Sequence, residues 1–339
     1  MEESRLSDEE LFRQLLGARA IDEVLALLHA SDEDYGVRHV AAACRRMALR
    51  VSTLDEGTEN DPRFLAFIRR ALRLLADEPL DPQDAATLLW AIALVRYQLP
   101  QLQELLPAIY KPFPDLVQAM GLQNATSCLQ AAAKLRREEP EVMELVPPLL
   151  RLVIDRAHAG ELRPQHVSAI IWAAGEMDLE EKEALELTGA VLARLSREQL
   201  EELSTKDLAN LAWGLAQLGE RDVTVLAAMA DIVADVAKQL DMKAATFDLP
   251  MIVCAFARLQ CLDRPFLEGV APRILQRKML RKINNWGLCA LAWSWPDRNV
   301  GGNVRSVRVA LEDQLTKRRI RSIQVERSWW GPQDWLQDQ

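Results

Sequence analysis

The chain has 339 residues, of which 49% are hydrophobic and 27% are charged, and its formal net charge is −9. This composition supports a buried core and excludes an intrinsically disordered chain. No apolar stretch approaches the roughly 18 residues that a membrane-spanning helix needs. Glycine and proline are scarce, with 14 and 16 residues, and long stretches rich in Leu, Ala, Glu and Arg favour helices over strands.

The first twelve residues form an acidic segment that precedes the repeats. Their sequence, MEESRLSDEELF, lacks the apolar core of a secretory signal and the Arg- and Ser-rich pattern of an organellar transit peptide. We therefore expect a cytosolic or nuclear chain, a mature form, or a fragment.

A helical motif recurs from residue 13 to residue 298. Its clearest copy is DLANLAWGLAQL at residues 207–218, and its tryptophan defines a reference position for the other copies. The seven reference residues are Arg45, Trp90, Gln130, Trp172, Trp213, Cys254 and Trp293. They are separated by 45, 40, 42, 41, 41 and 39 residues, which indicates a repeat of about 41 residues.

The residues around each reference position have the periodicity of a buried helix face. Those two before and two after it are apolar in every copy, and six of the seven residues three after it are Ala or Gly. Such a pattern predicts an apolar stripe that a neighbouring helix approaches closely. We expect the tryptophans at the reference positions to lie in the core between repeats, rather than to stack on bases. Ser204 with Asp207, and Asp81 with Pro82, mark helix starts.

Each of these helices is paired with a second predicted helix. The partners are expected at residues 64–75, 102–110, 141–157, 182–194, 223–240, 265–280 and 304–320. A single hairpin cannot bury its apolar face, so neighbouring hairpins must stack. The sequence therefore predicts an all-α fold: one right-handed α-solenoid of about seven helical hairpins.

Residues 299–339 do not follow the repeat. Gly301 and Gly302 interrupt the chain, and a basic helix is predicted to follow as far as about Arg321. The segment SWWGPQDWL then places three tryptophans within seven residues. We expect this segment to cap the last hairpin; the alternative is a docking peptide for a partner.

The sequence shows no arrangement of residues typical of an enzyme or a metal site. Five cysteines without a C-x-x-C pair argue against a disulfide framework and a zinc site, and indicate core packing in a reducing compartment. The four histidines do not pair at metal-ligand spacing, and there is no glycine-rich phosphate loop. We expect no catalytic activity, no cofactor and no small-molecule substrate.

The repeat resembles a known family. The segments LANLAWGLAQLG (208–219), ATLLWAIALV (86–95) and SAIIWAAGEM (168–177) resemble the second helix of octotricopeptide repeats and of FAST-kinase-like RAP-domain proteins. The resemblance implies a protein that binds single-stranded RNA and acts in transcript stability, processing or translation in a mitochondrion or chloroplast. The PPPEW-like element of many such repeats is absent, so the resemblance does not imply that each repeat reads one base. No RAP-like domain follows residue 298, so the resemblance implies no catalysis.

The charge distribution allows a second function. The acidic balance opposes binding to a polyanion, because neutralisation of phosphates dominates affinity for nucleic acid. A protein scaffold that uses an acidic solenoid surface in a larger assembly is therefore the alternative. Residues 273–327, however, carry 13 Lys and Arg against 4 Asp and Glu, whereas residues 1–272 carry 28 against 44.

Two sets of residues are candidates for RNA contact. The first is the basic block, in which Arg273, Arg277 and Arg281 are expected to share one face of a single helix. Its members are Arg273, Arg277, Lys278, Arg281, Lys282, Lys317, Arg318, Arg319 and Arg321. The second is the column four residues after the reference position, with Lys134, Gln217 and Arg258. In both sets, a solvated helix surface is the alternative to a binding site.

Overall fold

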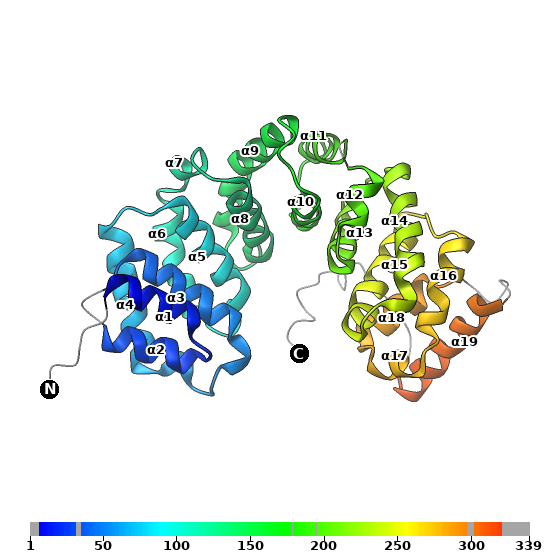
Figure 1. Cartoon of the computed structure of the whole chain (residues 1–339), viewed down its shortest axis with the longest axis horizontal. Coiled ribbons are helices and arrows are strands. Elements are labelled where there is room, and N and C mark those ends of the chain that lie inside the picture. Colours follow the sequence, from blue (N-terminus) through cyan, green and yellow to red (C-terminus); the bar gives the residue numbers. More distant parts are fainter. Residues whose placement is uncertain (1–6, 32–34, 178, 194, 297–301, 321–339) are drawn as a thin grey trace. The chain divides into compact units, whose positions relative to one another are not determined.

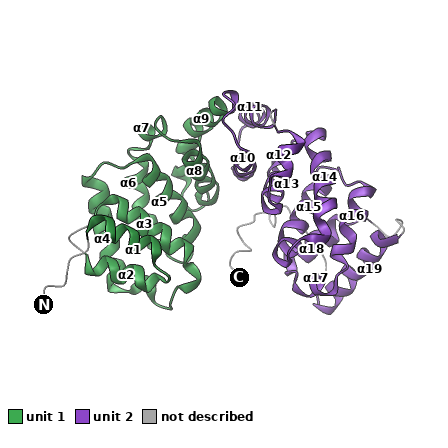
Figure 2. Ribbon diagram, viewed as in Figure 1, with its two compact units in different colours: residues 1–156 green, residues 157–339 purple. Residues whose placement is uncertain are grey.

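A computed structural model describes residues 7–31, 35–177, 179–193, 195–296 and 302–320 of the chain. Helices are the regular secondary structure throughout these ranges (Figure 1). In the same ranges no helix combines the length and apolarity needed to cross a membrane. The predicted all-α fold of stacked helical hairpins is confirmed. The chain divides into two compact units, residues 1–156 and residues 157–339 (Figure 2).

Unit 1 has an inner and an outer layer of helices. Each inner helix packs against the next inner helix along the chain: α1 (Asp8–Gly17), α3 (Val37–Leu49), α5 (Pro82–Val95) and α8 (Leu122–Leu135). The outer layer runs through α2 (Ile21–Ala30), α4 (Pro62–Asp77), η3 (Pro100–Leu105) and α6 (Leu106–Tyr110). Shorter elements connect the layers: η1 (Val51–Thr53), η2 (Thr58–Asn60), α7 (Phe113–Val117) and η4 (Pro140–Leu145), which leads into α9 (Val146–His158).

Unit 2 repeats this arrangement. Its inner helices, which again pack in chain order, are α10 (Pro164–Glu176), α13 (Thr205–Leu218), α15 (Leu249–Arg258) and α18 (Asn285–Ser294). The outer helices are α11 (Glu181–Leu192), α14 (Val223–Val236), α16 (Arg264–Ile274) and α19 (Gly302–Lys317). Short elements lie between outer and inner helices: α12 (Arg197–Glu201), η5 (Ala237–Gln239), η6 (Ala244–Asp248), a π-helical turn that continues into α15, and α17 (Arg277–Lys282).

The short third helix of several repeats was not predicted from the sequence. The single helix expected at residues 265–280 is wrong, because α16 ends at Ile274 and α17 begins at Arg277. The backbone of Gln276 is extended (φ −63°, ψ 122°), which turns the chain so that Met279 and Leu280 of α17 become buried. The burial of these two side chains therefore accompanies a break in the predicted helix, which forms two helices instead of one.

The predicted buried stripe and helix starts are confirmed. Every residue two before and two after the reference positions is buried, as Leu211 and Leu215 illustrate in α13. The Ser204 hydroxyl accepts a hydrogen bond from the backbone N–H of Asp207, whose carboxylate accepts one from the backbone N–H of Ser204. Asp81 caps α5 by accepting a hydrogen bond from the N–H of Gln83. These caps fix where the inner helices begin.

Hydrogen bonds between neighbouring repeats have the sequence separation of the repeat itself. The Tyr97 hydroxyl donates to the carboxylate of Glu138, 41 residues away, at 2.8 Å. The Arg221 guanidinium donates to the carbonyl of Gln260, 39 residues away, at 3.0 Å. Equivalent positions of successive repeats therefore lie side by side within each unit.

Arginines of the outer helices tie successive repeats together. Arg70 in α4 donates to the carbonyl of Tyr35 at 3.0 Å, and this residue lies between the preceding outer and inner helices. Arg273 in α16 donates to the carbonyls of Leu240 and Asp241, which occupy the same place one repeat earlier. Carbonyls between helices lack helical partners, so these arginines satisfy groups that would be costly to bury unpaired.

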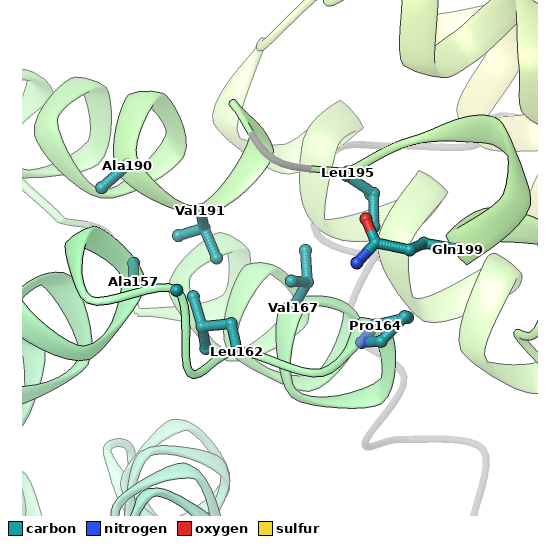
Figure 3. A pocket seen from close by; sticks show the side chains of 9 residues that line it. Ala157, Leu162, Pro164, Val167, Ala190, Val191, Leu195 and Gln199 are labelled. Atoms are coloured by element: carbon teal, nitrogen blue, oxygen red, sulfur yellow. The ribbon is translucent and has the colours of Figure 1, made fainter.

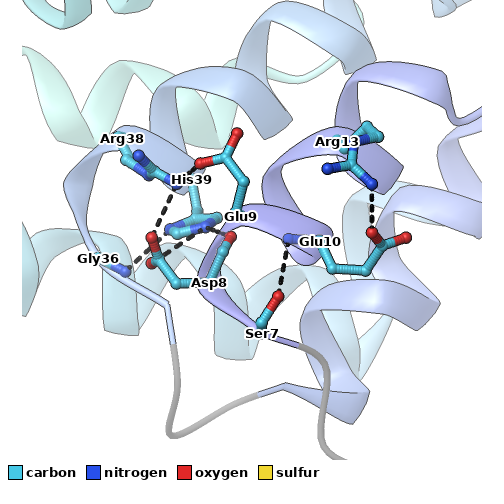
Figure 4. Close-up of polar contacts among 8 residues, drawn as sticks. All are labelled: Ser7, Asp8, Glu9, Glu10, Arg13, Gly36, Arg38 and His39. Carbon is cyan, nitrogen blue, oxygen red and sulfur yellow. Dashed lines mark hydrogen bonds and ion pairs between the residues drawn. The ribbon is translucent and has the colours of Figure 1, made fainter.

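The N-terminal helix belongs to the inner layer. It begins at Asp8, inside the acidic segment predicted for residues 1–12, and packs against α3. Arg38 of α3 forms ion pairs with Asp8 at 2.7 Å and Glu9 at 3.0 Å (Figure 4). The buried ring of His39 accepts from the N–H of Gly36 at Nδ1, and its Nε2 lies 2.9 Å from the Asp8 carbonyl oxygen. The acidic residues therefore anchor α1 on the first repeat.

The described part of the C-terminal region covers the last repeat. Helix α19 packs against both α16 and α18. The Trp295 indole donates to the carbonyl of Val304 at 2.8 Å and is buried. The tryptophan-rich segment at residues 328–336 lies outside the described residues.

Two glycines lie where the inner helices α10 and α13 approach each other closely. A Cβ atom on Gly175 of α10 would lie 2.9 Å from the Cα atom of Gly214 in α13. A Cβ atom on Gly214 would overlap the backbone carbonyl of Ile171. The predicted role of small residues in close helix packing is confirmed here.

We expect the Gly214→Ala substitution to lower the free energy of unfolding by about 1–3 kcal/mol, because backbone atoms of α10 cannot move aside without separating the two helices. Urea denaturation followed by circular dichroism measures the effect. Gly189→Ala is the matched control, since Gly189 is an exposed glycine within α11 and its added Cβ would contact nothing within 4 Å. The control should stabilise by up to about 1 kcal/mol. Equal effects of the two substitutions would contradict the packing argument.

Candidate nucleic-acid interface

A groove crosses three inner helices of unit 1. It has a volume of about 340 Å³ and lies where α3, α5 and α8 follow one another in the inner layer. We call it the unit 1 groove; its lining residues are Arg45, Leu49, Gln83, Ala86, Thr87, Trp90, Gln123, Asn124 and Ser127. Amide, hydroxyl, guanidinium and indole groups dominate this lining, in contrast to the apolar stripe on the buried face of the same helices.

Trp90 and Arg45 provide the two groups that suit a nucleotide best. Trp90 is half-buried in α5, with its side chain on the groove wall. Arg45 is an exposed residue of α3. Desolvation and then the nearby charges of Arg50 and Arg45 lower the pKa of Arg46, so the end of α3 gathers several positive charges. An aromatic face beside clustered cations can hold a base and its phosphate.

The amide and hydroxyl groups of the groove occupy equivalent positions in successive repeats. Gln83 and Gln123 lie seven residues before their reference positions, and Thr87 and Ser127 lie three before. They reach the groove because α5 and α8 start at the same point of the repeat, fixed in α5 by the Asp81 cap. Side chains that both donate and accept hydrogen bonds can read base edges. The sequence analysis missed these columns, although the repeat period was sufficient to find them.

The column four residues after the reference position is not a uniform exposed surface. Glu176 is 3% exposed and accepts a hydrogen bond from the Trp213 indole at 3.0 Å. Lys134, Gln217 and Arg258 are half-buried. Arg258 donates to the Gln217 side chain and lies over the Trp213 ring, 5.8 Å from its centroid. In unit 2 this column therefore links neighbouring repeats.

The tryptophans at the reference positions do not share one environment. Trp172 and Trp213 are buried, as predicted, and Trp90 is half-buried. The core position predicted for Trp293 is wrong, since its side chain is 43% exposed. The buried tryptophans of that repeat are Trp286 and Trp295, and Trp295 bonds to the carbonyl of Val304 in α19.

The predicted basic block contains two kinds of arginine. Arg273, Arg277 and Arg281 do not share one helix, and Arg273 is 7% exposed because it binds the carbonyls of the preceding repeat. Arg318 likewise donates to the carbonyls of Leu280 and Ile283, at 3.0 and 2.7 Å. Arg321 lies outside the described residues. These contacts remove Arg273 and Arg318 from the candidate phosphate ligands.

The remaining basic residues form one exposed surface, which we call the α17 surface. Arg318 fixes the end of α19 against α17, so cations from both helices gather there. Its exposed members are Arg277, Lys278, Arg281, Lys282, Lys317 and Arg319. Lys317 also pairs with Asp313 at 2.5 Å. The surface therefore combines net positive charge with access to solvent.

The cavity between α10, α11 and α12 offers little for catalysis. Its volume is about 280 Å³, and Gln199 is the one lining residue whose side chain carries a polar group (Figure 3). No group of three or more potential metal ligands exists among the residues that the structure describes. Burial raises the pKa of the Cys44 and Cys128 thiols to about 12, which disfavours the nucleophilic thiolate.

One carboxyl group in unit 2 has an unusual environment. Asp248 ends the π-helical turn η6 and is 9% exposed. Its burial, which outweighs the opposing charges of Lys206 and Lys243, raises its pKa to about 6; the carboxylates of Asp241 and Asp207 also raise it. The buried negative charge is therefore unfavourable in the folded chain above this pH.

We expect Asp248→Asn to increase the free energy of unfolding at pH 7 by on the order of 2 kcal/mol, because it removes this charge. In the wild type, stability should fall as the pH rises from about 4 to 6, since the unfolded chain releases the proton more readily than the folded chain. Thermal unfolding across this pH range measures both effects. Asp235→Asn, at an exposed carboxyl of α14, is the control. If the two variants shared one pH profile, burial of Asp248 would not be the cause.

Comparison with models of known protein families and with curated proteins finds no match to this chain.

Proposed function

We propose that this chain is a non-catalytic helical repeat protein that binds single-stranded RNA selectively and acts on the stability, processing or translation of organellar transcripts. The unit 1 groove carries the proposal. Trp90 and Arg45 both line this groove, together with a set of amides and hydroxyls. Stacking of an aromatic ring requires an unpaired base, which favours single strands over duplexes.

The two candidate surfaces suit different parts of RNA binding. Phosphate contacts supply most of the affinity and little sequence information, whereas contacts to bases supply specificity. The α17 surface is rich in exposed cations, so it suits phosphates. The unit 1 groove has few charges and many hydrogen-bonding side chains, so it suits bases.

A protein scaffold is the second candidate, favoured by the charge of the chain. Residues 1–272 carry a net charge of −16, which repels RNA over much of the surface. Cross-linking in cells followed by sequencing of bound RNA separates the two functions. Recovery of background transcripts alone, together with proteins that co-purify stably, would favour the scaffold.

We expect Trp90→Ala to weaken binding of a selected single-stranded RNA by about ten-fold, because it removes one stacked base. Trp90→Phe is the matched control and should retain most of the affinity, since it keeps an aromatic face. Fluorescence anisotropy with labelled RNA measures both variants, and their thermal unfolding shows whether the fold is intact. Wild-type affinity of a folded Trp90→Ala variant would exclude the unit 1 groove as a base site.

We expect reversal of Arg277, Arg281, Lys317 and Arg319 to Glu to weaken RNA binding uniformly across sequences. The slope of log affinity against log salt concentration should decrease by about 0.7 for each phosphate that the variant no longer neutralises. Stability should change little, because exposed charges contribute at most about 1 kcal/mol each. An unchanged salt slope would show that the α17 surface does not contact phosphates.

A further inference from the structure

A second groove lies on the outer side of unit 2, between α11 and the end of α13. Its volume is about 400 Å³. The α11 side is formed by Glu181, Ala184, Leu185 and Thr188, which share one face of the helix because their spacing is i, i+3, i+4, i+7. The opposite side is the turn at Gly219, whose left-handed backbone (φ 70°) ends α13. We call this site the α11 groove.

The two most exposed large hydrophobic residues of the described chain are Leu185, in the wall of the α11 groove, and Val223, at the start of the next outer helix. Leu185 is 57% exposed on its wall, and Val223 is 71% exposed at the start of α14, three residues after the groove residue Glu220. Elsewhere in unit 2 successive outer helices cover one another, since α14 packs along α16 and α16 along α19. Apolar side chains gathered at a groove in this way mark an interaction site rather than scattered surface residues.

The rim of the α11 groove is acidic. Glu181 is exposed, Glu220 is half-buried, and both line the groove. Arg221, the cation next to Glu220, directs its guanidinium to the carbonyl of Gln260 at 3.0 Å. The hydroxyl of Thr188, which also lines the groove, donates to the carbonyl of Leu185 and therefore has a hydrogen-bond partner within α11. Aliphatic side chains on one wall, Ala184 and Leu185, with carboxylates at the edge complement a ligand that is apolar in the centre and cationic at its ends.

We propose that the α11 groove binds an amphipathic helix of a partner protein, with apolar side chains at i, i+3 or i+4, and i+7 flanked by Lys or Arg. A helix fits because the outer layer of unit 2 is built from helices packed side by side, and a partner helix would continue this packing along α11. Leu185 would insert among the apolar side chains of the partner, and Glu181 and Glu220 would pair with its cations. The α11 groove shares no residue with either proposed RNA surface.

The test is selection from a random 16-residue peptide library displayed on phage, with the full chain as bait and its Leu185→Asp variant as counter-selection. We expect enriched peptides to carry apolar residues at helical spacing together with net positive charge. Absence of any enrichment that depends on Leu185, or enrichment of acidic peptides, would overturn the proposal.

Fluorescence anisotropy with one enriched peptide then measures the contribution of each group. Leu185→Asp should weaken binding by about ten-fold or more, because it places a charge on the apolar wall. Glu181→Lys combined with Glu220→Lys should also weaken binding and remove its salt dependence. Val309→Asp, at a 51% exposed valine of α19, is the matched control and should leave the affinity unchanged. Equal losses in Val309→Asp and Leu185→Asp would contradict a specific site.

Two further measurements distinguish a partner helix in the groove from RNA and from a second copy of the chain. The Leu185→Asp variant should bind RNA as the wild type does, so loss of peptide binding is distinguishable from failure of the RNA proposal. Light scattering measures the oligomeric state over a range of concentrations. If the wild type forms a dimer and the Leu185→Asp variant is a monomer, a second copy of the chain occupies the groove. That result would overturn the proposal of a partner helix.

Discussion

The fold depends on the close packing of inner helices, which is possible only because small residues stand where successive helices cross. A hairpin of this size leaves one face of its inner helix apolar, so each repeat needs its neighbour to exclude water. At Gly175 and Gly214 the contact is between backbones, with no room for a Cβ atom. Outer helices also approach closely, since a Cβ atom on Gly269 of α16 would lie 2.6 Å from the Cβ atom of Ala234 in α14. Hydrogen bonds of arginines such as Arg70 and Arg273 to interhelical carbonyls hold the repeats together there as well.

In unit 1 this packing leaves one face of the inner helices available for function. Two turns of a helix present both a buried stripe and an opposite face, and the side chains of that second face can vary because no core constrains them. In unit 1 the variable face carries Trp90, Gln83 and Ser127 around a groove. In unit 2 some of the equivalent positions are buried, as Trp213 and Glu176 show, and they bond to each other instead of facing solvent. Equivalent positions of the repeat thus form a candidate binding surface in unit 1 and hydrogen bonds between neighbouring repeats in unit 2.

The structure separates charged side chains that bind within the fold from those that face solvent. A count of basic residues treats Arg273 and Arg318 as equal to Arg277, but the first two satisfy backbone carbonyls and the third faces solvent. Only solvent-facing cations can neutralise phosphates. Acidic residues divide in the same way: Asp8 and Glu9 anchor α1 to Arg38, whereas Glu181 and Glu220 border the α11 groove. Net charge alone therefore neither excludes RNA nor locates a partner.

The sequence by itself determined the helical class, the repeat period, the buried stripe and the helix caps at Ser204 and Asp81, because these follow from local spacing within one or two turns. It did not reveal the turn at Gln276 that separates α16 from α17, nor the exposure of Trp293 in the last repeat. Both depend on which neighbouring helix covers which side chain. The grooves of unit 1 and of α11 also required the structure, since each is built from residues of successive repeats. Spacing along the chain specifies a helix face, but only packing between repeats decides whether that face is buried.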